Sequence, residues 1–140
     1  MIDIENETDT QINYTLLENI VNSIISQDVE IILTDNSTIQ GYNRQYRDID
    51  KPTDVLSFPI ENITGYEPAG TVIISLEYAK NISDELGHSL DEEVALLLIH
   101  GLLHLSGYDH EIDNGEMRDK EEYWIKEFRL PKSLIVRTQN

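Results

Sequence analysis

The segment Ser89-Leu-Asp-Glu-Glu-Val-Ala-Leu-Leu-Leu-Ile-His-Gly-Leu-Leu-His-Leu-Ser-Gly-Tyr-Asp-His110 decides how this chain of 140 residues folds. Ser89, with Glu92 three residues later, forms a capping box, the pattern that begins a helix. The residues that follow are apolar almost all round the predicted helix, so we expect it to be buried in the middle of the domain. Two histidines, His100 and His104, interrupt this apolar run and would be costly to bury without partners.

The spacing of three histidines in this segment predicts a metal site. His100 and His104 lie about 40° apart around the helix axis and one turn apart along it, which offers two imidazoles to one ion. The helix is expected to end near Leu105, and Gly107 permits a turn with positive φ that can bring His110 to the same point. Three imidazoles leave one coordination position open, as in catalytic zinc sites. Histidines without a metal are the alternative, and the spacing disfavours it.

One position separates this segment from the zinc proteases with similar spacing. The long motif H-E-x-x-H-x-x-G-x-x-H of the metzincin proteases matches at the three histidines and the glycine. Gly101 stands where those enzymes carry the glutamate base, so the spacing favours a metal and disfavours peptidase chemistry. A glycine inside a helix costs ~1 kcal/mol relative to alanine. We therefore expect a packing or access reason for Gly101, such as room for substrate beside the metal.

Two blocks of sequence carry a family resemblance. The run from His100 to His110 resembles the H-G-x-L-H-L-x-G-Y-D-H signature of the YbeY family, bacterial single-domain metal-dependent endoribonucleases that act in ribosomal RNA maturation. Tyr46-Arg47, followed by Pro-Thr-Asp-Val-Leu-Ser-Phe-Pro at 52–59, resembles that family's Y-R-x-x-D-x-P-T-D-V-L-S-F-P segment.

The resemblance covers residues 31 to 127 and contains one departure. Gly70-Thr71 stands where the family usually has Gly-Asp, which puts in doubt any role of an acid there, such as a partner to the metal ligands. The other positions that agree are an Ile-Ser-x-x-x-Ala segment before the predicted metal-binding helix, and a methionine and an acid after the last histidine: Ile74, Ser75, Ala79, Met117 and Glu121.

The resemblance implies a function and completes the expected site. It implies a zinc-dependent, single-strand-specific endoribonuclease in ribosomal RNA processing, including 3′-end maturation of the small-subunit RNA, and in ribosome quality control. One Zn²⁺ per chain on His100, His104 and His110 would activate a water or polarise a phosphodiester oxygen. Arg47 would be catalytic by holding the scissile phosphate, although an arginine considered alone is more often a surface residue.

Other polar residues are candidates for the cleft. Asp109 either orients an imidazole or caps its turn, and the sequence does not decide between them. Asp54 lines the cleft by resemblance only, and Ser106 is a turn residue that could reach the pocket. His88 is expected to be a surface or capping histidine rather than a fourth ligand. Three aromatic residues are expected in the core rather than as platforms for stacking bases: Tyr42, Tyr46 and Phe58.

The charge does not suggest a nucleic-acid protein. Ten basic residues against 27 acidic ones give a net charge of −17, whereas binding through phosphates needs basic surface. The acidic faces either serve solubility alone or leave RNA contact to local basic spots such as Arg44, Arg47 and Lys51. An acidic surface suits a basic ribosomal protein better than bare RNA, so such a protein or the ribosome is a further expected partner.

Two alternatives to a ribonuclease stay open. One keeps the metal and changes the substrate to another hydrolysable bond, peptide included, although Gly101 counts against it. The other is a non-catalytic ribosome assembly factor whose metal holds the fold. For a ribonuclease the general base is not identifiable, because Gly101 occupies its expected place; the metal hydroxide or the ribose 2′-hydroxyl could serve instead.

Length and composition predict one domain over residues 1–140. There is no cysteine, so no disulfide partner or thiolate site is expected, which fits a reducing cytoplasm. We expect no signal peptide, because the N-terminus Met-Ile-Asp-Ile-Glu-Asn-Glu is acidic and lacks a basic region and an apolar stretch. We expect no membrane span, because the longest apolar segment, 94–105, falls far short of the ~20 residues that a span requires.

The chain is predicted to be α+β, with about four strands in a mixed sheet and about five helices around the central metal-binding helix. Strand, helix, strand at the start implies a parallel pair. Residues 61–70 are expected to be a loop, and 134–136 are either a strand or a frayed end. Helix starts are predicted from capping pairs, the first of these helices running to about Gln27: Thr15 with Glu18, Ser37 with Gln40, Ser89 with Glu92, and Asp113 with Glu116.

Overall fold

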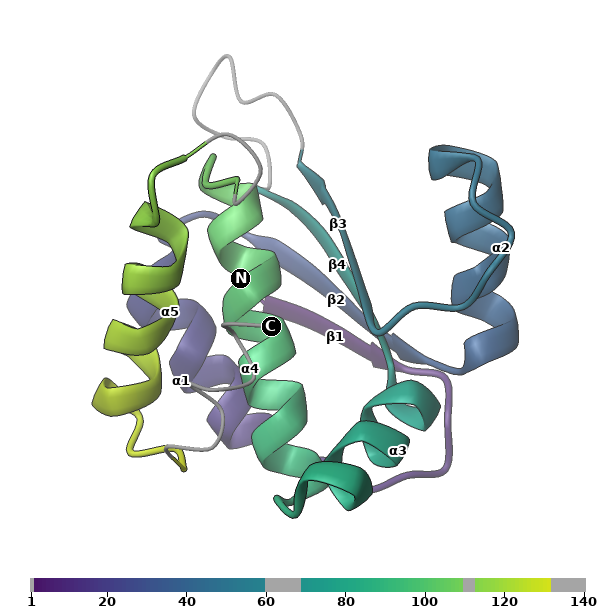
Figure 1. Cartoon of the computed structure of the whole chain (residues 1–140), viewed down its shortest axis with the longest axis horizontal. Coiled ribbons are helices and arrows are strands. Elements are labelled where there is room, and N and C mark those ends of the chain that lie inside the picture. The colour runs from purple at the N-terminus through teal and green to yellow at the C-terminus, as the bar shows by residue number, and fades with distance from the viewer. Residues whose placement is uncertain (1, 60–68, 110–112, 132–140) are drawn as a thin grey trace.

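The computed structural model describes residues 2–59, 69–109 and 113–131, and within these ranges it contains one four-stranded sheet and five helices (Figure 1). The predicted α+β class and element count are confirmed. The predictions for 61–68 and 134–136 lie outside the described residues. The elements in chain order are β1 (Ile2–Asn6), α1 (Tyr14–Ile24), β2 (Val29–Thr34), α2 (Asn36–Arg47), β3 (Val55–Pro59), β4 (Gly70–Ser75), α3 (Leu76–Leu86), α4 (Leu90–Leu105) and α5 (Glu116–Glu127).

The sheet is mixed, with strand order β1-β2-β4-β3. β1, β2 and β4 are parallel, and β3 runs antiparallel to β4 at the edge. Pro59, the last residue of β3, has no N–H to donate, and an edge strand tolerates this. Pro59 pairs with Gly70, so β3 ends where β4 begins. We call this end of the sheet the Gly70 end.

The two faces of the sheet carry different layers. Ile31 and Val72 belong to the large core that includes α1 and α4. Their strand neighbours Ile32 and Ile73 point the other way, as strand alternation requires, and join a smaller cluster with Ile39 of α2. Figure 1 shows the same division, with α1, α4 and α5 on one side of the sheet and α2 on the other.

Helix α4 occupies the centre of the larger core. It contacts β3 and β4 on one side and the helices α1, α3 and α5 around it. The predicted capping box is present, since Ser89 Oγ accepts from the Glu92 N–H and the Glu92 carboxylate accepts from the Ser89 N–H. Two turns of its apolar run, from Val94 to Leu102, contain fully buried side chains on several faces of the helix, so the predicted burial is confirmed.

Gly101 is explained by packing against the sheet. A Cβ at this position would lie 2.8 Å from Val72 Cγ1 and 3.1 Å from Ser57 Oγ. The glycine therefore lets α4 approach β3 and β4 closely, and it faces the sheet rather than open space for a substrate. A Cβ on Gly70 would lie 2.8 Å from Leu105 Cδ2, which places the last residue of α4 at the Gly70 end.

The predicted cap of α1 is wrong. The helix begins at Tyr14, because Asn13 Oδ1 accepts from the Leu16 N–H at 3.1 Å. The Asn13 N–H itself donates to Asp91 Oδ1 of α4, 78 residues away, at 3.0 Å. This long-range contact fixes where the helix starts. The helix also ends at Ile24, earlier than the predicted Gln27.

The caps of α2 and α5 also differ from the predictions. Asp35, rather than Ser37, caps α2 by accepting from the Thr38 N–H at 2.8 Å, and this hydrogen bond lowers the pKa of the Asp35 carboxyl. Gly115 precedes α5 in a left-handed conformation with φ 103°. Asp113 is therefore outside the helix, but its carboxylate still accepts from the Met117 N–H at 2.9 Å. None of the helices in the described ranges is long and apolar enough to cross a membrane.

Candidate metal centre

His100 and His104 bring two nitrogen atoms to one point. Their Nε2 atoms lie 3.1 Å apart, and their ring centroids lie 4.6 Å apart. Two nitrogens bound tetrahedrally to one zinc ion at about 2.0–2.1 Å are separated by about 3.3 Å. The pair therefore already has close to the separation that a shared ion requires.

Glu121 of α5 holds one of these rings in place. Its Oε1 lies 3.0 Å from His100 Nδ1, and its side chain is 2% exposed. A carboxylate can only accept, so the proton of the pair sits on Nδ1 when the ring is neutral, and Nε2 keeps its lone pair directed at His104. A metal-bound histidine usually donates its other ring N–H to a carboxylate, a backbone carbonyl or water, which fixes the orientation of the ring.

The role of Glu121 is the part of the site that sequence reasoning missed. The resemblance named an acid at this position without a function. A local signal was present, because Glu121 lies four residues from both Met117 and Ile125, whose side chains are buried. An acid on the buried stripe of a helix needs a partner. What the sequence does not show is which histidine, 21 residues earlier, supplies it.

The third predicted ligand, His110, lies outside the described residues. Within the described ranges, no three potential ligand side chains form a cluster. The three-histidine set and the zinc ion therefore stay predictions. The donor chemistry of the described part fits a zinc ion, since it offers two imidazole nitrogens and one of the rings is oriented by a carboxylate.

Arg47 lies across the sheet from the histidines. It is the exposed last residue of α2, and its side chain forms no ion pair with another described residue. The neighbouring Tyr46 ring contacts the Phe58 ring at 5.3 Å between centroids, which places this end of α2 at the Gly70 end. Arg47 and His104 thus share one end of the sheet but lie on opposite faces, and the catalytic role of Arg47 stays a prediction.

The remaining candidates are partly occupied by backbone contacts. Asp54 Oδ1 accepts from the Val55 N–H at 2.8 Å, at the start of β3 and away from the Gly70 end. Ser106 Oγ donates to the Leu102 carbonyl at 3.0 Å. The Asp109 carbonyl accepts from the Asp113 N–H at 3.2 Å, which is a turn contact and leaves the choice between its two predicted roles open.

His88 was expected to be a surface or capping residue, and for its side chain the surface position is wrong. Its side chain is 2% exposed, and its Nε2 lies 2.7 Å from Oε1 of the fully buried Glu93. Glu93 belongs to the first turns of α4, whereas the histidine pair lies near the end of the helix. His88 is buried because the end of α3 folds back onto α4.

Comparisons with known proteins agree on one family. The family model described as Endoribonuclease YbeY matches residues 2–129. Endoribonuclease YbeY of Nautilia profundicola is 52% identical over 140 residues, all of both chains, and that of Aliarcobacter butzleri is 51% identical over 138 residues, 98% of this chain and 99% of the relative. The solution structure of the Thermotoga maritima protein TM1509 matches with a TM-score of 0.63 at 32% identity, covering 91% of this chain and 89% of that one.

Proposed function

We propose, because this chain belongs to the YbeY family of endoribonucleases, that it cleaves single-stranded RNA in a zinc-dependent reaction during ribosomal RNA processing. The family membership supplies the endoribonuclease activity. The zinc dependence, the single-strand specificity and the ribosomal substrate are our proposals. They include 3′-end maturation of the small-subunit RNA and ribosome quality control, in the cytoplasm.

The observation that carries the proposal is the set formed by His104, His100 and Glu121. The two Nε2 atoms at 3.1 Å and the carboxylate at 3.0 Å from Nδ1 are arranged as a metal-binding pair with its support. We propose that His100, His104 and His110 hold one zinc ion per chain. When bound, zinc supplies Lewis-acid chemistry toward a phosphodiester oxygen.

The protein groups then have separate tasks. Glu121 keeps the His100 ring in the orientation that binds metal, and the 29% exposed His100 side chain leaves this part of the helix accessible. We propose that Arg47 binds a phosphate of the RNA from the Gly70 end, because its guanidinium offers paired donors. The residue at 101 supplies no general base, since Gly101 has no side chain and faces Val72.

The charge of the chain shapes how RNA is held. A net charge of −17 repels a polyanion that comes within the screening length of about 8–10 Å. Arg44 is partly neutralised, since its Nη1 lies 3.5 Å from Asp50 Oδ1, which leaves Arg47 and Lys51 as the basic residues of this corner. We propose that a basic ribosomal protein, or the ribosome itself, presents the RNA to the enzyme.

One experiment tests the zinc and the activity together. Zinc content and cleavage of a single-stranded ribosomal RNA fragment are measured on the same samples of wild type, Arg47→Ala and His104→Ala. We expect one zinc per chain and cleavage in wild type, zinc without cleavage in Arg47→Ala, and neither in His104→Ala.

Other outcomes contradict parts of the proposal. Zinc bound in wild type with every RNA left intact would favour the non-catalytic assembly factor. Undiminished cleavage by His104→Ala would remove the histidine pair from the mechanism. Undiminished cleavage by Arg47→Ala would mean that Arg47 is a surface residue without a catalytic role.

A further inference from the structure

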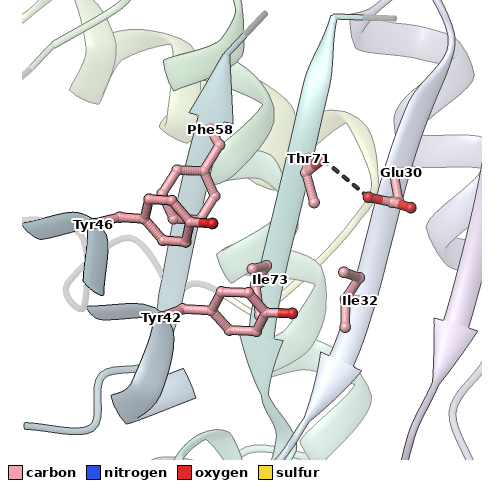
Figure 2. Close-up of a pocket in the computed structure, with 7 residues that line it drawn as sticks. All are labelled: Glu30, Ile32, Tyr42, Tyr46, Phe58, Thr71 and Ile73. Atoms are coloured by element: carbon pink, nitrogen blue, oxygen red, sulfur yellow. Dashed lines mark hydrogen bonds between the residues drawn. The ribbon is translucent and has the colours of Figure 1, made fainter. Parts of the chain in front are cut away.

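A pocket lies on the face of the sheet opposite to the histidines. Its volume is about 320 Å³, at the lower end of the range for small-molecule sites. Ile32 and Ile73 form its floor, as Figure 2 shows. The walls and rim come from α2 and from three strands: Tyr42, Tyr46, Phe58, Glu30 and Thr71.

The expectation that the three aromatic residues belong to the core is wrong for Tyr46, whereas Tyr42 and Phe58 are partly buried and pack against the smaller core cluster. Tyr46 is 60% exposed. Its ring lies 6.2 Å from the Tyr42 ring, nearly parallel at 17°, and 5.3 Å from the Phe58 ring. Figure 2 shows both tyrosine rings extending from α2 over the sheet, with their hydroxyl groups directed across it. The exposed Tyr46 ring, held beside the Tyr42 ring, offers a flat surface for stacking.

The polar rim selects what can enter. Glu30 Oε1 accepts from Thr71 Oγ1 at 3.1 Å (Figure 2), which uses one of about four lone-pair positions of the carboxylate. The carboxylate excludes a phosphate and accepts from N–H donors. Guanine presents two parallel donors, N1–H and the exocyclic amino group, on its Watson–Crick edge, and these match one carboxylate.

The pocket and the histidine pair lie toward the same end of the sheet. Phe58, in the pocket wall, precedes Pro59, which pairs with Gly70. Leu105, the neighbour of His104, contacts the other face at Gly70. Both sites therefore lie close to the Gly70 end, on opposite faces of the sheet.

We propose that this pocket binds one unpaired guanine of the RNA substrate, stacked on Tyr46 and hydrogen-bonded to Glu30. The inference rests on the proposed function, since it requires an RNA substrate. It also gives a reason for single-strand specificity, because a guanine inside a duplex has its Watson–Crick edge occupied and its faces covered. A neutral base is, moreover, the part of RNA that a chain of charge −17 binds without repulsion.

The test measures binding and cleavage of short single-stranded RNAs. Fluorescence anisotropy and steady-state kinetics compare an oligonucleotide containing guanosine with the same one containing inosine, which lacks the amino group. We expect Tyr46→Ala to raise Kd and KM about tenfold, as for the loss of one stacked base, with kcat within twofold of wild type. Glu30→Gln should remove the preference for guanosine over inosine.

Two variants control for folding and for the ring itself. Tyr46→Phe keeps the stacking surface and should keep wild-type Kd and KM. Tyr123→Ala removes another exposed tyrosine, 50% exposed on α5, and should also leave both constants unchanged. Equal losses in Tyr46→Ala and Tyr123→Ala would overturn the assignment.

The remaining outcomes separate this inference from the proposed function. If wild type binds the guanosine RNA through Tyr46 but never cleaves RNA, the function fails and the pocket assignment stands. If RNA is cleaved and Tyr46→Ala changes neither Kd nor KM, the pocket assignment fails alone. If Tyr46→Ala weakens binding of an oligoarginine peptide instead of RNA, the pocket recognises a basic protein, and the guanine assignment is overturned.

Discussion

Two histidine–glutamate pairs border helix α4, and they differ in what surrounds them. His100 Nδ1 lies 3.0 Å from Glu121, and His88 Nε2 lies 2.7 Å from Glu93. The His100 side chain is 29% exposed, whereas that of His88 is 2% exposed. The pair of an imidazole and a carboxylate therefore occurs twice, once partly exposed at His100 and once buried at His88.

The difference lies in the second nitrogen of each ring. His100 Nε2 faces His104 Nε2 at 3.1 Å, the arrangement on which the proposed metal site rests. His88 Nδ1 is buried and makes no hydrogen bond within the described part of the chain. The proposed metal site thus involves the pair whose second ring nitrogen faces another histidine. At His88 the pair joins the end of α3 to the start of α4.

Replacing His100, the histidine of the more exposed pair with Glu121, should have the largest effect. His100→Ala removes one ligand, and we expect zinc to be lost and RNA cleavage to fall by about a thousandfold, since Lewis-acid stabilisation amounts to several kcal/mol. Metal analysis and cleavage rates measure this. His88→Ala, assayed in parallel, should keep both its zinc and its activity, and equal losses in the two variants would erase the distinction between the pairs.

Replacing His88, the histidine of the buried pair with Glu93, should instead lower the free energy of unfolding. His88→Ala leaves the Glu93 side chain, which is 0% exposed, without its ring partner, and we expect the free energy of unfolding to fall by about 3 kcal/mol. Urea denaturation of the zinc-loaded protein measures the change. A loss under 1 kcal/mol would mean that the pair contributes little to holding α3 against α4.

Changing Glu121, the carboxylate that contacts His100, should have an intermediate effect on zinc binding. Glu121→Gln keeps the size of the side chain but weakens its support of the His100 ring, so zinc affinity should fall by about 10- to 100-fold. Competition with a chelator measures the affinity, and circular dichroism checks that the helices are retained. Glu93→Gln is the matched control, expected to bind zinc as wild type does.

The smallest effect is expected from Gly101→Ala, next to His100. Alanine would gain ~1 kcal/mol in helix propensity, but its Cβ would lie 2.8 Å from Val72 Cγ1, and overpacking costs about 1–3 kcal/mol. We expect a net destabilisation of about 1 kcal/mol in thermal unfolding, with zinc affinity retained. A stabilised Gly101→Ala variant would show that α4 is able to move away from the sheet.

The sequence predicted those parts of the fold that depend on local patterns. The apolar run of α4, its capping box and the strand–helix–strand start were all readable, because periodicity and caps act within a few residues. The caps of α1 and α2 were misplaced, since neighbouring residues offered equivalent capping groups. At α1 the choice depends on Asp91, which contacts Asn13 across 78 residues.

For the candidate site too, the sequence predicted the features that depend on local spacing and missed those that depend on long-range packing. The spacing of His100 and His104 predicted converging nitrogens because one helical turn is enough to produce them. The Glu121 contact and the burial of His88 depend on how α5 and α3 pack on α4, which no local pattern reports. The opposite placement of Arg47 follows from α2 covering the other face of the sheet.

With the proposed zinc site, the position of Glu121 late in the chain has a consequence for the order in which that site forms. Both histidines of the pair leave the ribosome before α5 does, because synthesis proceeds from the N-terminus. Until α5 folds against α4, the His100 ring has no carboxylate to hold it, and its affinity for an ion stays low. We therefore expect a nascent chain of this nuclease to be inactive toward the ribosomal RNA that surrounds it during its own synthesis.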